Sequence, residues 1–362
     1  MQLQPDESTG YTGDMAKGRD AEARDALVLK TRTILLIVAA LYGTNFGSIK
    51  VMQETLPPST AALLRFTLAL GALSPYLAST PRALWRPGLE IGLWVALGYV
   101  VQGIGLDSGS SASTAAFLCS LAVVVCPLLD KLDGVKIARK TWGAAGLAVL
   151  GVAVLEITGG KPPSTGDLWS LLQPVGFGMG FWKIEKVMRD FPGKGKELTA
   201  IQLVVVWVMG ALWSLYDNGG SLPDFAQVSG TMAQLPVAAA VLWTGLITTA
   251  LTVLLQTTSL GVLSSSETTV LYSTEPVWAA AFASVVLGEE ISVNTLVGGA
   301  MIMAACILST TTSEGEGEAD TADAAAGVEQ NLLIEGAPES DSKVGQARNE
   351  GGEFPVPKRG VK

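Results

Sequence analysis

The chain has 362 residues, of which 49% are hydrophobic and 16% charged, and its mean hydropathy is +0.40. This composition is too apolar for a soluble protein of this length, so the expected environment is a lipid bilayer. The chain contains no histidine, which excludes imidazole metal sites, histidine-based catalytic triads and a histidine pH switch. Any proton transfer would therefore depend on carboxylates.

The first predicted segment is an N-terminal arm, residues 1–32, in which acidic and basic side chains are mixed. It has no short apolar core, and it carries too many acids for a transit peptide, so it does not resemble a cleaved targeting signal. We expect this arm on the cytoplasmic side.

Ten apolar runs follow the arm, each long enough to cross a hydrocarbon core about 30 Å thick as a helix. They are apolar on all sides, whereas strands of a membrane barrel would be polar at every second position. The sequence therefore predicts an all-α integral membrane protein with ten transmembrane helices. The runs cover Thr33–Met52, Ser59–Ala78, Leu89–Gly105, Ser110–Leu129, Lys140–Ile157, Asp167–Val187, Leu198–Tyr216, Pro236–Gly261, Ser265–Leu287 and Val293–Leu308.

Basic residues gather in every second loop between these runs. Arg82 and Arg86 lie in one such loop, and the loops around Lys136 and Lys194 are also basic, whereas the opposite loops contain a single lysine, Lys161. Because basic loops resist translocation, both termini are expected in the cytoplasm, and an even number of spans is favoured. The pattern does not distinguish the plasma membrane from an organelle membrane.

The chain also resembles itself. The segment "IKVMQETLP" at Ile49 returns as "EKVMRDFPG" at Glu185, and "FLCSLAVVV" in the fourth run aligns with "VLYSTEPVW" in the ninth. We therefore predict two five-helix repeats, residues 33–157 and 167–310, joined by a linker at 158–166. Because five is odd, the second repeat would enter the membrane from the opposite side, as in many transporters.

The C-terminal segment, residues 311–362, has a different composition. It holds 5 basic and 11 acidic residues and little apolar surface to bury, which predicts a disordered acidic tail. Most of the net charge of −9 thus belongs to this tail and does not imply a cationic substrate.

Several motifs resemble the EamA-type branch of the drug/metabolite transporter superfamily. They are "ALYGTNFGSIKVM", "PPSTAALLRF", "STEPVWAAAFASVVLGEE" and "LVGGAMIMAACIL", which together span both repeats. The resemblance implies a ten-helix fold with cytoplasmic termini and a central cavity that carries small metabolites. Its sharpest element is Glu275 followed by Pro276. The first repeat departs from it, because the matching residues there are Ala122 and Val123.

Glu275 and Pro276 lie near the middle of the ninth run. A carboxylate at that depth is costly unless it faces a wet cavity or a partner, and the proline frees a backbone carbonyl and is expected to kink the helix. Both are therefore candidates for gating or substrate binding, with protons as a coupling ion. The alternative is that Glu275 only bonds a neighbouring helix.

Arg65 in the second run could bind a carboxylate or phosphate, or it could instead reach the outer surface or pair with a glutamate. Neutral polar and aromatic side chains deeper in the runs suit zwitterions, rings or ammonium groups. These candidates are Asn45, Tyr99, Gln102, Trp182, Gln202, Trp243, Gln256 and Tyr272.

The favoured function is a secondary transporter, independent of ATP, that gives alternating access to a central cavity between the repeats. An enzyme is not expected, because the sequence shows no catalytic cluster and no phosphate-binding loop. The other alternative is a non-transporting scaffold or receptor that acts through its acidic tail. The expected partners are a small metabolite and the lipid bilayer, without nucleic acid, metal or cofactor, and a homodimer stays open.

Overall fold

The computed structural model describes residues 8–135, 139–157, 164–291 and 293–313, and every regular element in these ranges is a helix. The predicted all-α fold class is thereby confirmed. Residues 158–163 of the predicted linker and 314–362 of the predicted tail lie outside the described residues. The helices are α1 (Ser8–Gln53), α2 (Pro58–Leu73), the 3₁₀ helix η1 (Ser74–Ser79), α3 (Arg82–Asp107), α4 (Ala112–Cys119), α5 (Ala122–Leu132), α6 (Arg139–Ile157), α7 (Thr165–Ser170), α8 (Gln173–Asp190), α9 (Gly195–Asp217), α10 (Phe225–Met232), α11 (Leu235–Leu242), the π-helix η2 (Trp243–Leu251), α12 (Thr252–Ser259), α13 (Ser265–Tyr272), α14 (Glu275–Val286) and α15 (Val293–Ser313).

Among the described residues, six helical stretches are long and apolar enough to cross a membrane, judged by length and composition. Large apolar side chains on them are exposed, for example Leu93 and Leu212, each 55% exposed. Such surface is costly in water and suits contact with lipid. The six stretches are Glu22–Gln53, Pro58–Ser79, Arg82–Asp107, Ala112–Leu132, Gly195–Asp217 and Leu235–Ser259. The number of ten spans stays a prediction.

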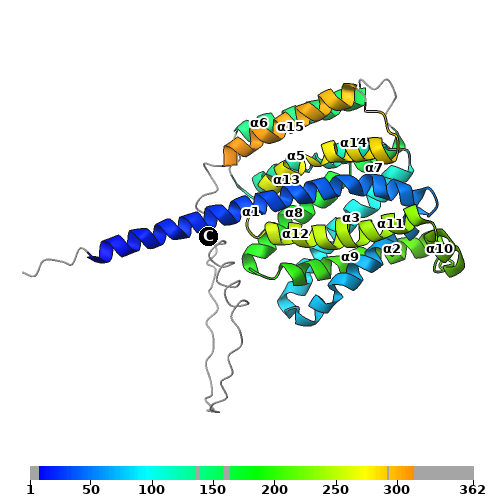
Figure 1. The fold of residues 1–362 in the computed structure, drawn as a ribbon, viewed down its shortest axis with the longest axis horizontal. Coiled ribbons are helices and arrows are strands. Elements are labelled where there is room, and N and C mark those ends of the chain that lie inside the picture. Colours follow the sequence, from blue (N-terminus) through cyan, green and yellow to red (C-terminus); the bar gives the residue numbers. More distant parts are fainter. Residues whose placement is uncertain (1–7, 136–138, 158–163, 292, 314–362) are drawn as a thin grey trace, which may run out of the picture.

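The N-terminal arm joins the first apolar run without a break. Residues 8–53 form the single helix α1, which extends well beyond the rest of the helices at its N-terminal end (Figure 1). The boundary predicted at residue 33 therefore has no counterpart in the backbone.

The fourth and ninth runs are each divided into two helices, α4 with α5 and α13 with α14, and the sixth run is likewise divided into α7 and α8. At the first interruption the Ser120 hydroxyl donates to the Phe117 carbonyl (2.7 Å), and at the second the Ser273 hydroxyl donates to the Thr269 carbonyl (2.9 Å). Serine hydroxyls that bond back to the preceding turn compete with the helical ladder. The sequence alignment of the two runs places Ser120 on Ser273, so both interruptions fall at the same aligned position.

The expectation that Pro276 kinks one continuous helix is therefore wrong in detail. Pro276 lies in the first turn of a new helix, α14, where its missing N–H leaves no bond unmade. The interruption between α4 and α5 has no proline beside it, because Pro127 lies inside α5. The two interruptions therefore share a back-bonded serine and do not share a proline.

The two interrupted helices also begin alike. The Ser111 hydroxyl accepts from the Thr114 amide at the start of α4 (2.9 Å), and the Ser264 hydroxyl accepts from the Glu267 amide at the start of α13 (3.1 Å). A serine at this position satisfies an amide that the first helical turn leaves free. Ser111 aligns with Ser264, so the cap and the interruption recur at one spacing in both runs.

The second helix of the fourth run and that of the ninth run have matching contacts in the two halves of the chain. α14 packs against α1 and α4, and α5 packs against α8 and α13, while α6 packs along α15 at one edge of the fold (Figure 1). The contact between α1 and α14 depends on Gly43, because a Cβ there would lie 2.5 Å from the Trp278 Cβ. This close approach brings Tyr42, next to Gly43, to the same region as the start of α14.

Candidate functional site

A cavity lies between the interrupted helices and the helices that pack on them. The space between its lining atoms is about 640 Å³, an upper limit because part of it is open, which suits a small molecule rather than a polymer. Its lining comes from both predicted repeats and consists of Tyr42, Asn45, Val95, Tyr99, Gln102, Cys119, Ser120, Ala122, Phe177, Phe181, Val253, Gln256, Thr269, Tyr272 and Glu275.

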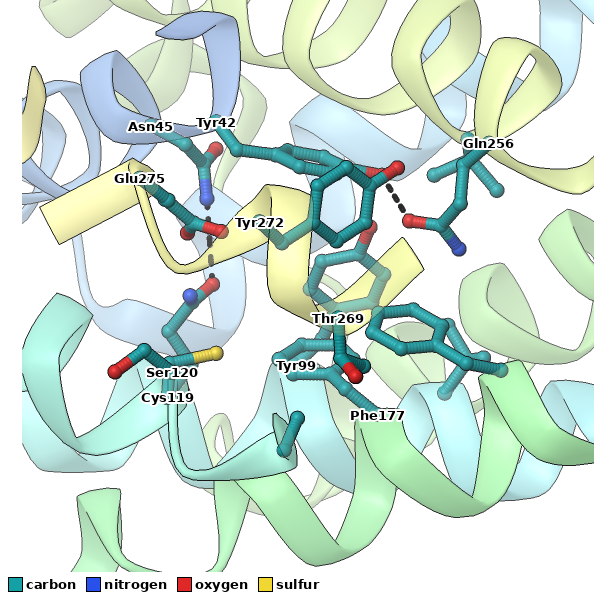
Figure 2. A pocket seen from close by; sticks show the side chains of 15 residues that line it. Tyr42, Asn45, Tyr99, Cys119, Ser120, Phe177, Gln256, Thr269, Tyr272 and Glu275 are labelled. Atoms are coloured by element: carbon teal, nitrogen blue, oxygen red, sulfur yellow. Dashed lines mark hydrogen bonds between the residues drawn. The ribbon is translucent and has the colours of Figure 1, made fainter. Parts of the chain in front are cut away.

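Glu275 is the carboxylate of this cavity. It is the first residue of α14, directly after the interruption, and its half-buried side chain faces the space shared with the tyrosines (Figure 2). Within the described part of the chain, no charged group or hydrogen-bond donor is found to pair with the carboxylate. The alternative that Glu275 only bonds a neighbouring helix therefore has no contact to support it.

Aromatic rings form a connected wall around the cavity. Tyr42 meets Tyr272 edge-on with ring centres 5.6 Å apart, and Tyr272 meets Phe181 at 5.8 Å. The wall continues from Phe181 to Phe177 (6.4 Å) and from Phe177 to Tyr99 (5.1 Å). Three of these contacts are edge-to-face and the Phe177–Phe181 pair is stacked, and such packing fixes the orientation of each ring. The wall is therefore built before any ligand arrives.

A chain of hydrogen-bonded polar side chains runs along another side of the cavity. Arg65 Nη1 donates to Asn45 Oδ1 (3.4 Å), Asn45 Nδ2 to Gln102 Oε1 (3.4 Å), and Gln102 Nε2 to Gln173 Oε1 (3.3 Å). Thr248, in the π-helix η2, also donates to Asn45 Oδ1 (2.8 Å). π-helical segments are often found at functional sites. This network fixes the two amides that line the cavity, Asn45 and Gln102.

Two tyrosine hydroxyls differ in their bonding. Tyr42 donates to Gln256 Oε1 (2.9 Å), as the dashed line in Figure 2 shows. The buried Tyr272 hydroxyl has no partner among the described residues. A buried hydroxyl without a partner is costly, so this group is free to bond a ligand or a water molecule.

Six of the residues singled out in the sequence meet in this cavity: Asn45, Tyr99, Gln102, Gln256, Tyr272 and Glu275. Pro276 is buried next to Glu275 but is not part of the lining.

Arg65 takes neither of its two alternative positions, at the outer surface or beside a glutamate. It is only 3% exposed, and its guanidinium lies 4.5 Å from the ring centre of Phe66 and 4.8 Å from that of Tyr99. In the described ranges no carboxylate pairs with it. Arg65 therefore neither reaches the surface nor pairs with a glutamate, and it contacts the cavity only through Tyr99 and Asn45.

Three further candidates lie elsewhere. Trp182 donates to Asp130 (2.9 Å), Trp243 is 38% exposed and donates to Thr44 (2.8 Å), and Gln202 is fully buried away from the cavity. The indole rings are held at helix surfaces, so depth in an apolar run alone was a poor guide to the lining.

Tyr42, Phe177 and Phe181 line the cavity but were not among the predicted site residues. Phe177 and Phe181 are four residues apart in α8, which places them on one helical face. That spacing, within the glycine-rich "PVGFGMGF", was the available signal.

A carboxylate–serine contact lies at each end of the interrupted pair. Glu289, just after α14, accepts from the Ala112 amide (2.9 Å) and the Ser113 hydroxyl (2.8 Å) at the start of α4. Asp130, near the end of α5, accepts from the Ser266 hydroxyl (2.7 Å) at the start of α13. The alignment places Ser113 on Ser266. The same kind of contact therefore joins α14 to α4 at one end and α5 to α13 at the other.

Lysines lie beside both contacts. Lys50 Nζ is 3.9 Å from Glu289, and Lys186 pairs with Asp133 one turn beyond Asp130. The two lysines occupy the same place in the repeated segments "IKVMQ" and "EKVMR".

Comparison with known proteins supports a relationship to transporters. A family model described as the EamA-like transporter family matches residues 164–311, which include Glu275. A protein of Archaeoglobus fulgidus called "Uncharacterized transporter" is 26% identical over 276 residues, 76% of this chain and 83% of that protein. A crystal structure described only as that of a protein is 15% identical with a TM-score of 0.57, and the match covers 78% of this chain and 98% of that chain. At this identity the last match concerns the fold alone.

Proposed function

We propose that this protein, which belongs to the EamA-like transporter family, is a secondary transporter that moves small metabolites through its central cavity. The resemblance found in the sequence motifs is thereby confirmed, and the chain is an integral multi-pass membrane protein of a transporter family. The proposal goes further in assigning the cavity and the mode of transport.

The observation that carries the proposal is the position of the cavity. Both halves of the chain line it, at the interruption between α4 and α5 and at the interruption between α13 and α14. The carboxylate of Glu275 lies at the second of these. Interrupted helices near the middle of a membrane are a common way to build a transport site. The ten-span fold with two inverted repeats is part of this proposal, and the recurring caps, interruptions and paired helix contacts support it.

Alternating access would follow from the two end contacts. Opening one end of the cavity requires that Glu289 leave Ser113, and opening the other requires that Asp130 leave Ser266. Hydrogen bonds of a few kcal/mol or less can be exchanged between two conformations on the timescale of transport. Each end would therefore open while the other stays bonded.

The remaining features of the proposal concern orientation and coupling. Both termini would face the cytoplasm, whether the membrane is the plasma membrane or that of an organelle, as the basic loops indicate. A proton gradient would supply the energy for transport, through exchange of a substrate for a proton at Glu275. The groups around that carboxylate include Tyr42 from α1, Tyr99 from α3, Cys119 from α4 and Tyr272 from α13. An imposed pH gradient should then change the transport rate in vesicles.

The test uses the purified full chain in liposomes loaded with an isotope-labelled mixture of amino acids, nucleosides and amines. Release of at least one compound above the level of protein-free liposomes is expected. A chain shortened after Ser313 should release it at the same rate. Release by neither form would contradict the transporter proposal, and loss of activity in the shortened chain alone would favour a function that depends on the tail.

A further inference from the structure

We propose that the ligand of this cavity is an organic monocation, an ammonium group attached to an aromatic or apolar body. The inference rests on the proposed function, because it names the substrate class of the same cavity. It follows from the charge of the lining, from its aromatic wall, and from how the nearby positive groups are already bound.

The charge of the lining favours a cation. Glu275 is the only acidic or basic side chain among the lining residues, and the structure gives its carboxylate no partner within the described ranges. Placing a carboxylate in an apolar region without compensation is costly, whereas a paired one is tolerated. A ligand with one positive charge supplies the missing partner.

The aromatic wall favours the same ligand. Tyr42, Tyr99 and Tyr272 lie on the lining with Glu275 (Figure 2), and Phe177 and Phe181 complete the wall. An ammonium group is attracted to the faces of aromatic rings, and the same rings bury the apolar part of a ligand. A cation thus gains from the carboxylate and from the rings at once.

An anion or a zwitterion would need a positive group as well, and none of the lining residues supplies one. The Arg65 guanidinium is stacked on Phe66 and Tyr99 and bonded to Asn45, and it is not part of the lining. The amides at the start of α5, where the first half lacks a carboxylate, are bonded within their own turn: Val123 N to the Ser120 carbonyl (3.1 Å) and Val124 N to the Leu121 carbonyl (2.9 Å). A carboxylate on the ligand would therefore find no free donor at this interruption.

The test compares four compounds that share a phenylethyl body and differ in charge. These are phenethylamine (a cation), 2-phenylethanol (neutral), 3-phenylpropionate (an anion) and phenylalanine (a zwitterion). Their binding to the detergent-solubilised full chain is measured by isothermal titration calorimetry. Phenethylamine should bind at least about tenfold more tightly than each of the others, because only the cation forms a charge-assisted contact without bringing an unpaired group.

Two variants test whether Glu275 is responsible for the preference for a cation. Glu275→Gln should weaken phenethylamine binding by about tenfold or more and leave 2-phenylethanol binding unchanged. Glu90→Gln is the matched control, because Glu90 is 56% exposed and pairs with Lys183 outside the cavity, and it should change neither. Since Glu275→Gln removes an unpaired charge, it should fold as well as the wild type.

A second pair of variants tests the wall. Tyr272→Phe keeps the ring and removes a hydroxyl that has no partner in the described structure, whereas Tyr272→Leu removes the ring. The first should bind phenethylamine nearly as well as the wild type, and the second should bind it about threefold or more weakly.

Three results would overturn the inference: phenylalanine or 3-phenylpropionate binding as tightly as phenethylamine, unchanged phenethylamine affinity in Glu275→Gln, or no binding of phenethylamine at millimolar concentration. The liposome assay separates this failure from failure of the proposed function. Release of an uncharged or anionic metabolite with no amine binding would refute the substrate class and leave the transporter standing. Amine binding without release of any compound would refute transport and leave the cation site standing.

Discussion

Breaking one end contact should open the cavity to one side of the membrane. In Glu289→Ala the Ala112 amide (2.9 Å) and the Ser113 hydroxyl (2.8 Å) both lose their acceptor. Hydrogen bonds to a charged group contribute about 1.5–3 kcal/mol each when buried, and the side chain of Glu289 is 20% exposed, so the contact is worth about 2 kcal/mol in total. That corresponds to a shift of about 30-fold in the population open at this end.

The opposite end offers a matched variant. Asp130 accepts from the Ser266 hydroxyl (2.7 Å) and from Trp182 Nε1 (2.9 Å), again two bonds to one carboxylate. Asp130→Ala should therefore shift the population by a similar factor toward the opposite side.

Cys119 provides a native reporter for this prediction, because it is half-buried and lines the cavity. With Cys126 and Cys306 replaced by serine, the rate at which an impermeant methanethiosulfonate reagent modifies Cys119 is measured from each side of oriented vesicles. Glu289→Ala should speed modification from one side and Asp130→Ala from the other. Equal rates in both variants and the parent, or acceleration from the same side in both, would refute the reasoning.

Three other changes have definite expectations. Pro276→Ala should leave the interruption between α13 and α14 in place, because the matching interruption between α4 and α5 exists without a proline beside it, and distances between spin labels on the two helices should not change. Gly43→Val should cost about 1–3 kcal/mol of stability in thermal unfolding, because its Cβ would lie 2.5 Å from the Trp278 Cβ, while Gly71→Val, with nothing within 4 Å, should cost little. Arg65→Lys should weaken ligand binding in calorimetry by severalfold, because lysine cannot stack between two rings as a planar guanidinium does.

Hydrophobicity and loop charge predicted the helical class and placed Glu275 near the middle of an apolar run, since both depend on composition over about 20 residues. The division of the fourth run was not predicted. The Ser120 hydroxyl bonds to the preceding turn at this division, but in the sequence Ser120 is indistinguishable from a serine that merely packs.

The cavity was predicted in part for a similar reason. Asn45, Gln102 and Gln256 stand out as amides in apolar sequence, whereas Phe177 and Phe181 look like any lipid-facing residue. Which face of a helix turns inward depends on close approaches such as that at Gly43, and these require the packed structure.

Transport by Glu275→Gln tests the central claim most directly. In liposomes loaded with the labelled mixture, the wild type is compared with Glu275→Gln and with the control Glu90→Gln, at equal amounts of folded protein. The wild type and Glu90→Gln should release the transported compound at the same rate, and Glu275→Gln should release it about tenfold more slowly or not at all. If Glu275→Gln releases the compound at the wild-type rate, the cavity at Glu275 is not the transport site.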